Sequence, residues 1–238
     1  MIHGLYNGAA ALDVIARQQE LISANLANLN TSGYRRAQFV VAQRENPSPG
    51  GTAKELGPEV LEVQTDFQNG RLHPTGRALD ASLVGDGFFS FQSPEGVVYS
   101  RGGRFFRDAD SGTLINSEGH AVLGENGTIE VPDDVGDNAI TIAEDGTVSA
   151  GGEELGKLAV TSFADNQTLI PLSQSVFRAG PQSVATESTA SVTQFNQEFS
   201  NTNPVSEMIA MVIGMRQYEA VQKASTAMSE SLREHIRA

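Results

Sequence analysis

The chain lacks cysteine and tryptophan, and aromatic residues make up only 6% of its 238 residues. Without cysteine, disulfide bonds and thiolate chemistry are excluded, and nothing indicates a redox compartment. The sequence also lacks an apolar run of about 18 residues, the length that a transmembrane helix requires, so we expect no membrane insertion. No basic segment precedes a continuous apolar stretch near the N-terminus, so we expect no cleaved signal peptide.

Residues suited to catalysis or metal binding are few and scattered. None of the four histidines, His3, His73, His120 and His235, lies three or four residues from another. This spacing indicates neither a pair of metal ligands nor a Ser-His-Asp site. Gly85-Asp-Gly87 lacks the third glycine and the following helix of a dinucleotide site, and a turn is the better interpretation. We therefore expect no catalytic, cofactor-binding or metal-binding residues, and no enzyme.

A second acidic, glycine-containing segment resembles the start of a calcium loop. It contains Asp108, Asp110 and Gly112, but Gly119 occupies the position that an EF-hand fills with glutamate. We therefore predict a turn at this segment and no metal site.

The net charge of −13 is unevenly distributed along the chain. Residues 1–44 carry more basic than acidic side chains and residues 200–238 are balanced, so the excess acid lies in the middle. An acidic middle region discourages binding of nucleic acid. Within this pattern, we interpret Arg35-Arg36 as a surface or interface pair and Arg101-Gly-Gly-Arg104 as a polar turn.

Both ends of the chain have helical periodicity. Near the N-terminus, apolar residues recur at alternating intervals of three and four, which predicts a helix over about residues 6–30 with one narrow apolar seam. Near the C-terminus, Asn203 suits an N-cap and Pro204 the first position of a second helix, which extends to about residue 236. The apolar face of this second helix is rich in methionine, which packs adaptably.

The middle of the chain has a different pattern. Short apolar segments alternate with glycine- and aspartate-rich turns every 8–12 residues, which is typical of an all-β sandwich or a distorted barrel. Segments 79–91 and 97–107 are each predicted to form a pair of strands. The Ser/Thr/Gln-rich segment 185–199 is predicted to be a connector.

Together these patterns predict a mixed α and β fold with discontinuous domains. Residues 1–75 and 186–238 form a terminal helical axial domain with extended linkers, whose helices pack like a coiled coil. Residues 76–185 form an inserted, all-β middle domain. We favour packing of the terminal helices between chains, because their apolar stripes are narrow and the middle domain has its own core; pairing within one chain is the alternative. The expected assembly interface consists of Leu5, Leu12, Ile15, Ile22, Leu26, Met208, Val212, Met215 and Leu232.

Several short motifs carry a family resemblance that covers nearly the whole chain. Ala24-Asn-Leu-Ala-Asn28, followed by Asn30-Thr-Ser-Gly33-Tyr34-Arg35, resembles the N-terminal signature of the flagellar rod and hook proteins. Further blocks of this family follow in the same order, at residues 70–80, 85–89, 99–105, 112–114, 119–124, 145–148, 200–205 and 208–219.

The resemblance implies a structural subunit of the bacterial flagellar basal-body rod. It implies self-assembly through the terminal helices into a drive shaft that transmits torque from motor to hook, in the periplasm. It implies other rod subunits, further copies of this chain and the flagellar type III export apparatus as partners. The turn after the first helix would be shaped by Asn25, Asn28, Gly33 and Tyr34.

The subtype and one other class stay open. The chain length and Asn203-Pro204-Val205 favour the proximal rod type, whereas Ile213-Gly-Met215-Arg216-Gln-Tyr218 is closer to the distal rod type. A distal rod or hook-type axial subunit is therefore the alternative. A non-flagellar, β-rich binding module, with its helices paired within one chain, is the competing class.

Overall fold

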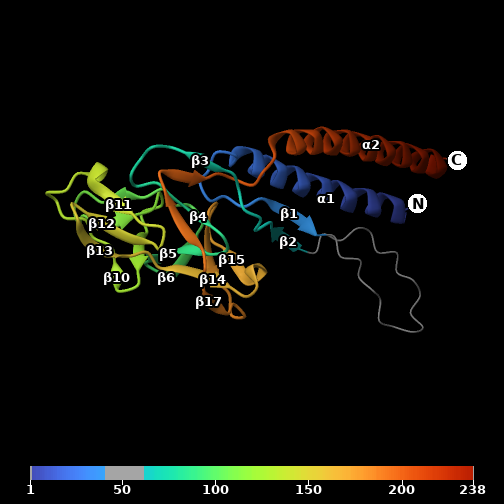
Figure 1. Ribbon diagram of the computed structural model, residues 1–238. Helices are drawn as coiled ribbons and strands as arrows, with labels where there is room; N and C mark the ends of the chain where they lie inside the picture. Colours follow the sequence, from blue (N-terminus) through green and yellow to red (C-terminus); the bar gives the residue numbers. More distant parts are fainter. Residues whose placement is uncertain (1, 41–61, 238) are drawn as a thin grey trace. The chain divides into compact units, whose positions relative to one another are not determined.

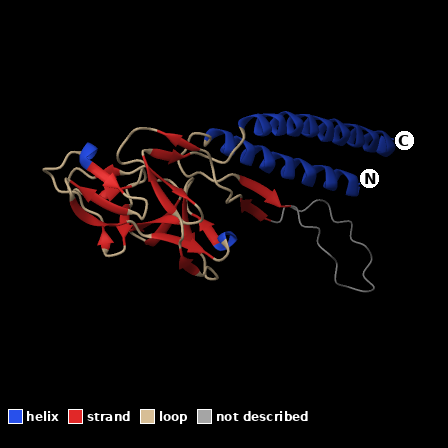
Figure 2. Cartoon of the chain, viewed as in Figure 1, coloured by secondary structure: helices blue, strands red, loops and turns tan. Residues whose placement is uncertain are grey.

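The computed structural model describes residues 2–40 and 62–237, and the side chains of residues 7–40 and 63–230 (Figure 1). The fold is mixed, with one N-terminal helix, one C-terminal helix and a large β-rich middle (Figure 2). The chain divides into two compact units, Met1–Ala27 with Ala37–Asp66 and Thr202–Ala238, and Asn28–Arg36 with Phe67–Asn201. We call these the helical unit and the β unit. Compared with the predicted middle domain, the β unit also includes residues 28–36, 67–75 and 186–201.

The helical unit contains two long helices and one small sheet. Helices α1, Ile2–Ala27, and α2, Pro204–Arg237, run antiparallel, and strands β1, Ala37–Val40, and β2, Glu62–Thr65, pair in antiparallel fashion. Helix α2 begins as predicted, since the Asn203 Oδ1 accepts hydrogen bonds from the amides of Val205 at 3.0 Å and Ser206 at 3.3 Å. The first predicted helix is three residues shorter than expected at its C-terminal end.

The β unit is built around one sheet of ten strands. Its main path follows the order β15-β16-β6-β5-β9-β8-β7, with β10 beside β9 and with β14 joining β17 to β5. Strands β11, β12 and β13 form a separate sheet, and β18 with β4 and β19 with β3 form two-stranded ribbons. The bounds are β3 Leu72–Pro74, β4 Ala81–Val84, β5 Phe88–Ser93, β6 Gly96–Ser100, β7 Phe106–Arg107, β8 Leu114–Ile115, β9 Ala121–Gly124, β10 Gly127–Thr128, β11 Ile140–Ile142, β12 Thr147–Ala150, β13 Glu153–Lys157, β14 Val160–Phe163, β15 Leu169–Pro171, β16 Val176–Ala179, β17 Ala185–Glu187, β18 Ser191–Gln194 and β19 Asn196–Glu198.

Strand β5 separates two apolar clusters, because successive side chains of a strand point to opposite faces of the sheet. Phe89 and Phe91, both at most 1% exposed, belong to the main core. Phe88 lies in a second, aromatic cluster with Phe163 and Phe177. Burial of each such ring contributes about 1.5–3 kcal/mol of stability. Strand β5 therefore stabilises both clusters.

The structure corrects three predictions about the middle of the chain. Residues 185–199 are not a connector, because they contain strands β17, β18 and β19. Segments 79–91 and 97–107 do each contain two strands, but these do not pair with one another: β4 pairs with β18, and β5 pairs with β6. The polar composition of 185–199 concealed strands whose outward side chains face water, while Val192 of β18 is 1% exposed.

Candidate functional site

Helices α1 and α2 approach closely because a glycine of each helix faces a side chain of the other. A Cβ at Gly8 would lie 2.7 Å from the Ser225 hydroxyl, and a Cβ at Gly214 would collide with the Gln19 side chain. The Gln19 Nε2 donates a hydrogen bond to the carbonyl of Met211 at 2.9 Å, so this polar side chain is satisfied between the two helices. The helices are therefore paired within the chain.

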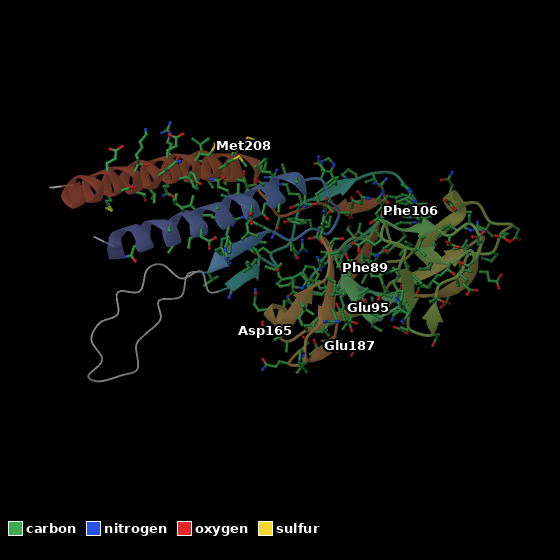
Figure 3. All side chains as sticks on the ribbon, turned by 180° about the vertical axis from the view of Figure 1, so that it is seen from behind. Phe89, Glu95, Phe106, Asp165, Glu187 and Met208 are labelled. Carbon is green, nitrogen blue, oxygen red and sulfur yellow. The ribbon has the colours of Figure 1, made fainter. Side chains whose placement is uncertain are left out.

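A different side of α2 carries large apolar side chains that the described residues leave about half exposed. Met208 is 54% exposed, Val212 45% and Met215 49%, and Figure 3 labels Met208 on the side of α2 away from α1. Exposed apolar side chains gathered on one face mark sites of protein interaction. We call this set the outward apolar face; it consists of Val205, Met208, Ile209, Val212, Ile213 and Met215, which are 45% to 63% exposed.

The residues predicted to form the assembly interface fall into three groups. Ile15 and Ile22 are buried at 9% and 5% exposure, and Leu12 and Leu26 are half-buried. Met208, Val212 and Met215 lie on the outward apolar face and are not brought together with these α1 residues. The side chains of Leu5 and Leu232 lie outside the described residues.

The residues expected to shape the turn after the first helix make specific contacts. In the helical unit, the Asn25 side chain donates to the carbonyl of Ala37 at 2.9 Å and accepts from its amide at 3.0 Å. In the β unit, the Asn28 Oδ1 accepts from the Thr31 hydroxyl at 3.1 Å, and Tyr34 is buried. Side-chain amides that bond the backbone in this way fix the path of a turn.

A buried carboxylate, Glu198, joins separate segments of the β unit. It is 0% exposed, and its two oxygens accept hydrogen bonds from the Arg35 Nη2 at 2.7 Å and the Arg101 Nε at 2.9 Å. The amide of Gly70 donates to the same carboxylate at 2.7 Å. Residues far apart in the sequence are thereby held at one point. We call Glu198, Arg35 and Arg101 the Glu198 cluster.

The remaining donors of Arg101 hold the loop between β4 and β5. Its Nη1 donates to the carbonyls of Gly85 at 2.8 Å and Gly87 at 2.7 Å, and its Nη2 to the carbonyl of Leu83 at 3.1 Å and the Asn69 Oδ1 at 3.2 Å. The Gly85-Asp-Gly87 segment therefore turns its carbonyl oxygens toward a guanidinium, in agreement with the predicted turn. A phosphate cradle would instead present backbone amides.

Glycines allow backbone segments to meet around the Glu198 cluster. Gly33 has φ +73°, and a Cβ there would collide with the backbone of Gly102. A Cβ at Gly70 would collide with the carbonyl of Phe199. Since no other residue leaves this space free, the glycines of the sequence motifs are explained by close packing of three separate segments.

The interpretation of Arg35 as a surface residue and that of Arg101 as part of a polar turn were wrong. Arg35 is 3% exposed and Arg101 is 2% exposed, so neither belongs to a surface pair or a solvated turn. Their partner Glu198 was missed because it is separated from Arg35 by 163 residues and from Arg101 by 97. The local sequence contains no sign of such a long-range pairing.

The Asp108 segment is a turn, as predicted. The Asp108 Oδ1 accepts hydrogen bonds from the amides of Asp110 at 3.1 Å and Ser111 at 2.9 Å, and from the Ser111 hydroxyl at 2.9 Å.

Within residues 2–40 and 62–237, no group of three or more His, Asp or Glu side chains is placed to hold a metal ion. None of the helices described there is long and apolar enough to cross a membrane.

Hydrogen bonds from Ser111 and then Asp110 lower the pKa of Asp108, and those from Thr147 lower the pKa of Asp145. Because these pKa values lie below those of the unfolded chain, the stabilisation is complete above about pH 4 and is lost as the pH falls through the folded values. We expect the double variant Asp108→Asn with Asp145→Asn to have a melting temperature that falls less steeply than that of the wild type below about pH 4. Thermal melting followed by circular dichroism tests this, with Asp110→Asn as control; equal slopes would contradict it.

Comparison with known proteins gives matches over most of the chain. The family model "Flagella basal body rod protein" matches residues 5–35, "Flagellar hook protein FlgE/F/G D1 domain" matches 82–150, and "Flagellar basal body rod FlgEFG protein C-terminal" matches 193–238. Two relatives are described as "Flagellar basal-body rod protein FlgG". The one from Agrobacterium fabrum is 31% identical over 93% of this chain and 94% of its own length, and the one from Bacillus subtilis is 28% identical over 99% and 98%. "Flagellar basal-body rod protein FlgF" from Salmonella typhimurium is 30% identical over 97% and 96%.

Proposed function

The chain belongs to the family of flagellar basal-body rod proteins, and we propose that it assembles into the rod through the outward apolar face of α2. It is a structural rod subunit and not an enzyme, and its location is the basal-body rod.

The outward apolar face is the observation that supports this proposal most strongly. Met208, Val212 and Met215 are each about half exposed while α2 is already paired with α1. Burying the open half of such a side chain against a neighbour contributes about 1 kcal/mol. Several such side chains together contribute several kcal/mol to the binding free energy of a subunit contact. The flexible methionines can adapt to neighbours of different sequence.

The contact we propose is heterologous, meaning that the outward apolar face of one chain meets a different surface of the next. Contacts of this kind generate open helical assemblies when they do not close into a ring. The helices would then form a coiled-coil-like axial layer. Ile15, Ile22, Leu12 and Leu26 would support it through the α1–α2 seam, and the outward apolar face would join the copies. We propose that Leu5, near the start of α1, and Leu232, near the end of α2, also belong to this interface.

The resemblance also supports proposals about partners and route. We propose that the subunit is exported unfolded by the flagellar type III apparatus, joins other rod subunits and further copies of itself in the periplasm, and transmits torque from motor to hook. A chain kept unfolded before export would not present the outward apolar face, which would limit polymerisation before export. Binding of nucleic acid is not part of this proposal.

We propose the proximal rod type as the subtype, on the basis of Asn203-Pro204-Val205 and the length of the chain. The distal type is the second candidate, favoured by the segment from Ile213 to Tyr218. The two differ in the stage at which the rod would stop growing without this subunit.

Electron microscopy of basal bodies from a strain that lacks the gene tests the proposed function. We expect no rod beyond an early stage and no swimming, with both restored by the full chain and not by a chain without α1 or α2. An early arrest supports the proximal type and a late arrest the distal type. Normal basal bodies and normal swimming in the strain without the gene would contradict the proposal.

A further inference from the structure

An exposed aromatic residue of the β unit has an unusual backbone conformation. Among the described residues, Phe195 alone of the non-glycine residues has a positive φ, +62°, and its side chain is 45% exposed. Its amide donates to the carbonyl of Asp80 at 2.8 Å, and its own carbonyl accepts from the amide of Thr75 at 2.8 Å. A bulky residue in this region is strained by roughly 1–2 kcal/mol. Strain of this kind persists chiefly where a site requires it.

A positively charged group lies beside the same backbone segment. Arg104 pairs through its backbone with Asp80, the residue that accepts the Phe195 amide. The Arg104 guanidinium carbon lies 5.4 Å from the centre of the Phe106 ring, and that of Arg77 lies 4.7 Å from it; Figure 3 labels Phe106. Arg77 is bound to the Asp80 carboxylate at 2.9 Å, whereas Arg104 has no carboxylate partner within the described part of the chain. We call Phe195, Arg77, Arg104 and Phe106 the Phe195–Arg104 surface.

The composition of this surface is that of a protein-binding site. Arginine and aromatic residues are enriched at the energetic centres of protein interfaces, where a rigid ring and a guanidinium lose little freedom on binding. Stacking on Phe106 holds Arg104 in place before a partner arrives. The surface thus presents an apolar ring and an available positive charge.

Another part of the β unit has the complementary charge. Residues 108–157 contain many acidic side chains and a single lysine, Lys157, which is bound to Glu125 at 2.7 Å. We call residues 108–157 the acidic segment. Two copies that met acid to acid would repel one another, whereas Arg104 of one copy and the acidic segment of the next would attract. The exposed acidic side chains of this segment include Asp110, Glu118, Glu130, Asp133, Asp134, Asp137, Glu144, Asp145, Glu153 and Glu154.

We infer that the Phe195–Arg104 surface binds the acidic segment of a neighbouring copy of this chain. The inference rests on the proposed assembly into the rod and adds a second contact, made by the β units. This contact is heterologous, as the proposed contact of α2 is, so both can be made between copies that repeat in one direction. The strain at Phe195 is then retained because its ring is used between chains.

Two substitutions in the full-length chain test the inference through the number of copies incorporated into isolated basal bodies. We expect Arg104→Glu to lower incorporation by about tenfold or more, whereas Arg178→Glu, which makes the same charge change on an exposed position of β16, leaves it unchanged. We expect Phe195→Gly to lower incorporation too, while its melting temperature is no lower than that of the wild type, because glycine adopts a positive φ without strain. Incorporation of Phe195→Gly or Arg104→Glu at the wild-type level would overturn the inference.

Cross-linking identifies the occupant. The chain has no cysteine, so Thr75→Cys, at an exposed position whose amide bonds the Phe195 carbonyl, in one copy and Asp134→Cys in another provide the only thiols. We expect a bismaleimide to join these two copies in isolated basal bodies at least about tenfold more than it joins Arg178→Cys to Asp134→Cys. Equal yields would overturn the inference and leave the proposed rod function standing. Failure of the wild-type gene to restore rods would instead overturn the proposed function itself.

Discussion

A negative charge at Met215 or Val212 is expected to abolish incorporation into the rod while both units stay folded. These side chains are 49% and 45% exposed in the isolated chain, so an aspartate at either position remains solvated there. In the assembled rod, the same carboxylate would be enclosed by apolar side chains of a neighbour. A charge buried without a partner costs several kcal/mol, which exceeds the contribution of the whole side chain that it replaces.

The test compares Met215→Asp and Val212→Asp with a matched control on the same helix. Gln222→Asp adds the same charge two turns further along α2, where the neighbouring side chains Glu219, Lys223 and Thr226 are exposed and polar. Swimming and electron microscopy of basal bodies provide the readout, and circular dichroism of the purified chains checks the fold. The outcome that would contradict the account is normal rods with both apolar-face variants.

Glu198→Gln is expected to destabilise the β unit by about 3–5 kcal/mol, which is the effect of removing one partner from a buried ion pair. Glu198 is fully buried and accepts from Arg35 and Arg101, so a neutral amide would leave two guanidinium groups without a counter-charge at that point. The amide would also place donors against the amide of Gly70, which now donates to the carboxylate.

Urea unfolding followed by circular dichroism measures this effect, and Glu187→Gln on the exposed strand β17 is the control. We expect the control to lie within about 0.5 kcal/mol of the wild type, as is usual for surface substitutions. If Glu198→Gln unfolded at the same urea concentration as the control, the Glu198 cluster would have no part in holding the β unit together.

The sequence predicted the elements that have strong local signals. The apolar periodicity from Leu12 to Leu26 predicted the first helix, and Asn203-Pro204 predicted the start of the second. The spacing of turn residues predicted a β-rich middle. These features depend on neighbours within about four residues, so a single sequence contains them. The Asp108 turn was predicted for the same reason, since its hydrogen bonds lie within three residues.

Strand partners and the Glu198 cluster could not be predicted, because they depend on residues far apart in the chain. Strand β4 pairs with β18 across more than 100 residues, and the polar composition of 185–199 concealed the second member of that pair. Arg35 and Arg101 are buried because each of them pairs with the buried carboxylate of Glu198. The sequence shows three charged residues in three motifs and no indication that they meet.

The central claim, that the outward apolar face of α2 joins neighbouring subunits, is tested most directly by labelling Val212→Cys with a maleimide. Because the chain contains no other cysteine, all labelling reports on this one position. We expect rapid labelling of the free subunit, where Val212 is 45% exposed, and labelling at least about tenfold slower in isolated rods, since a neighbour covers the face. Equally rapid labelling in the free subunit and in the rod would contradict the account.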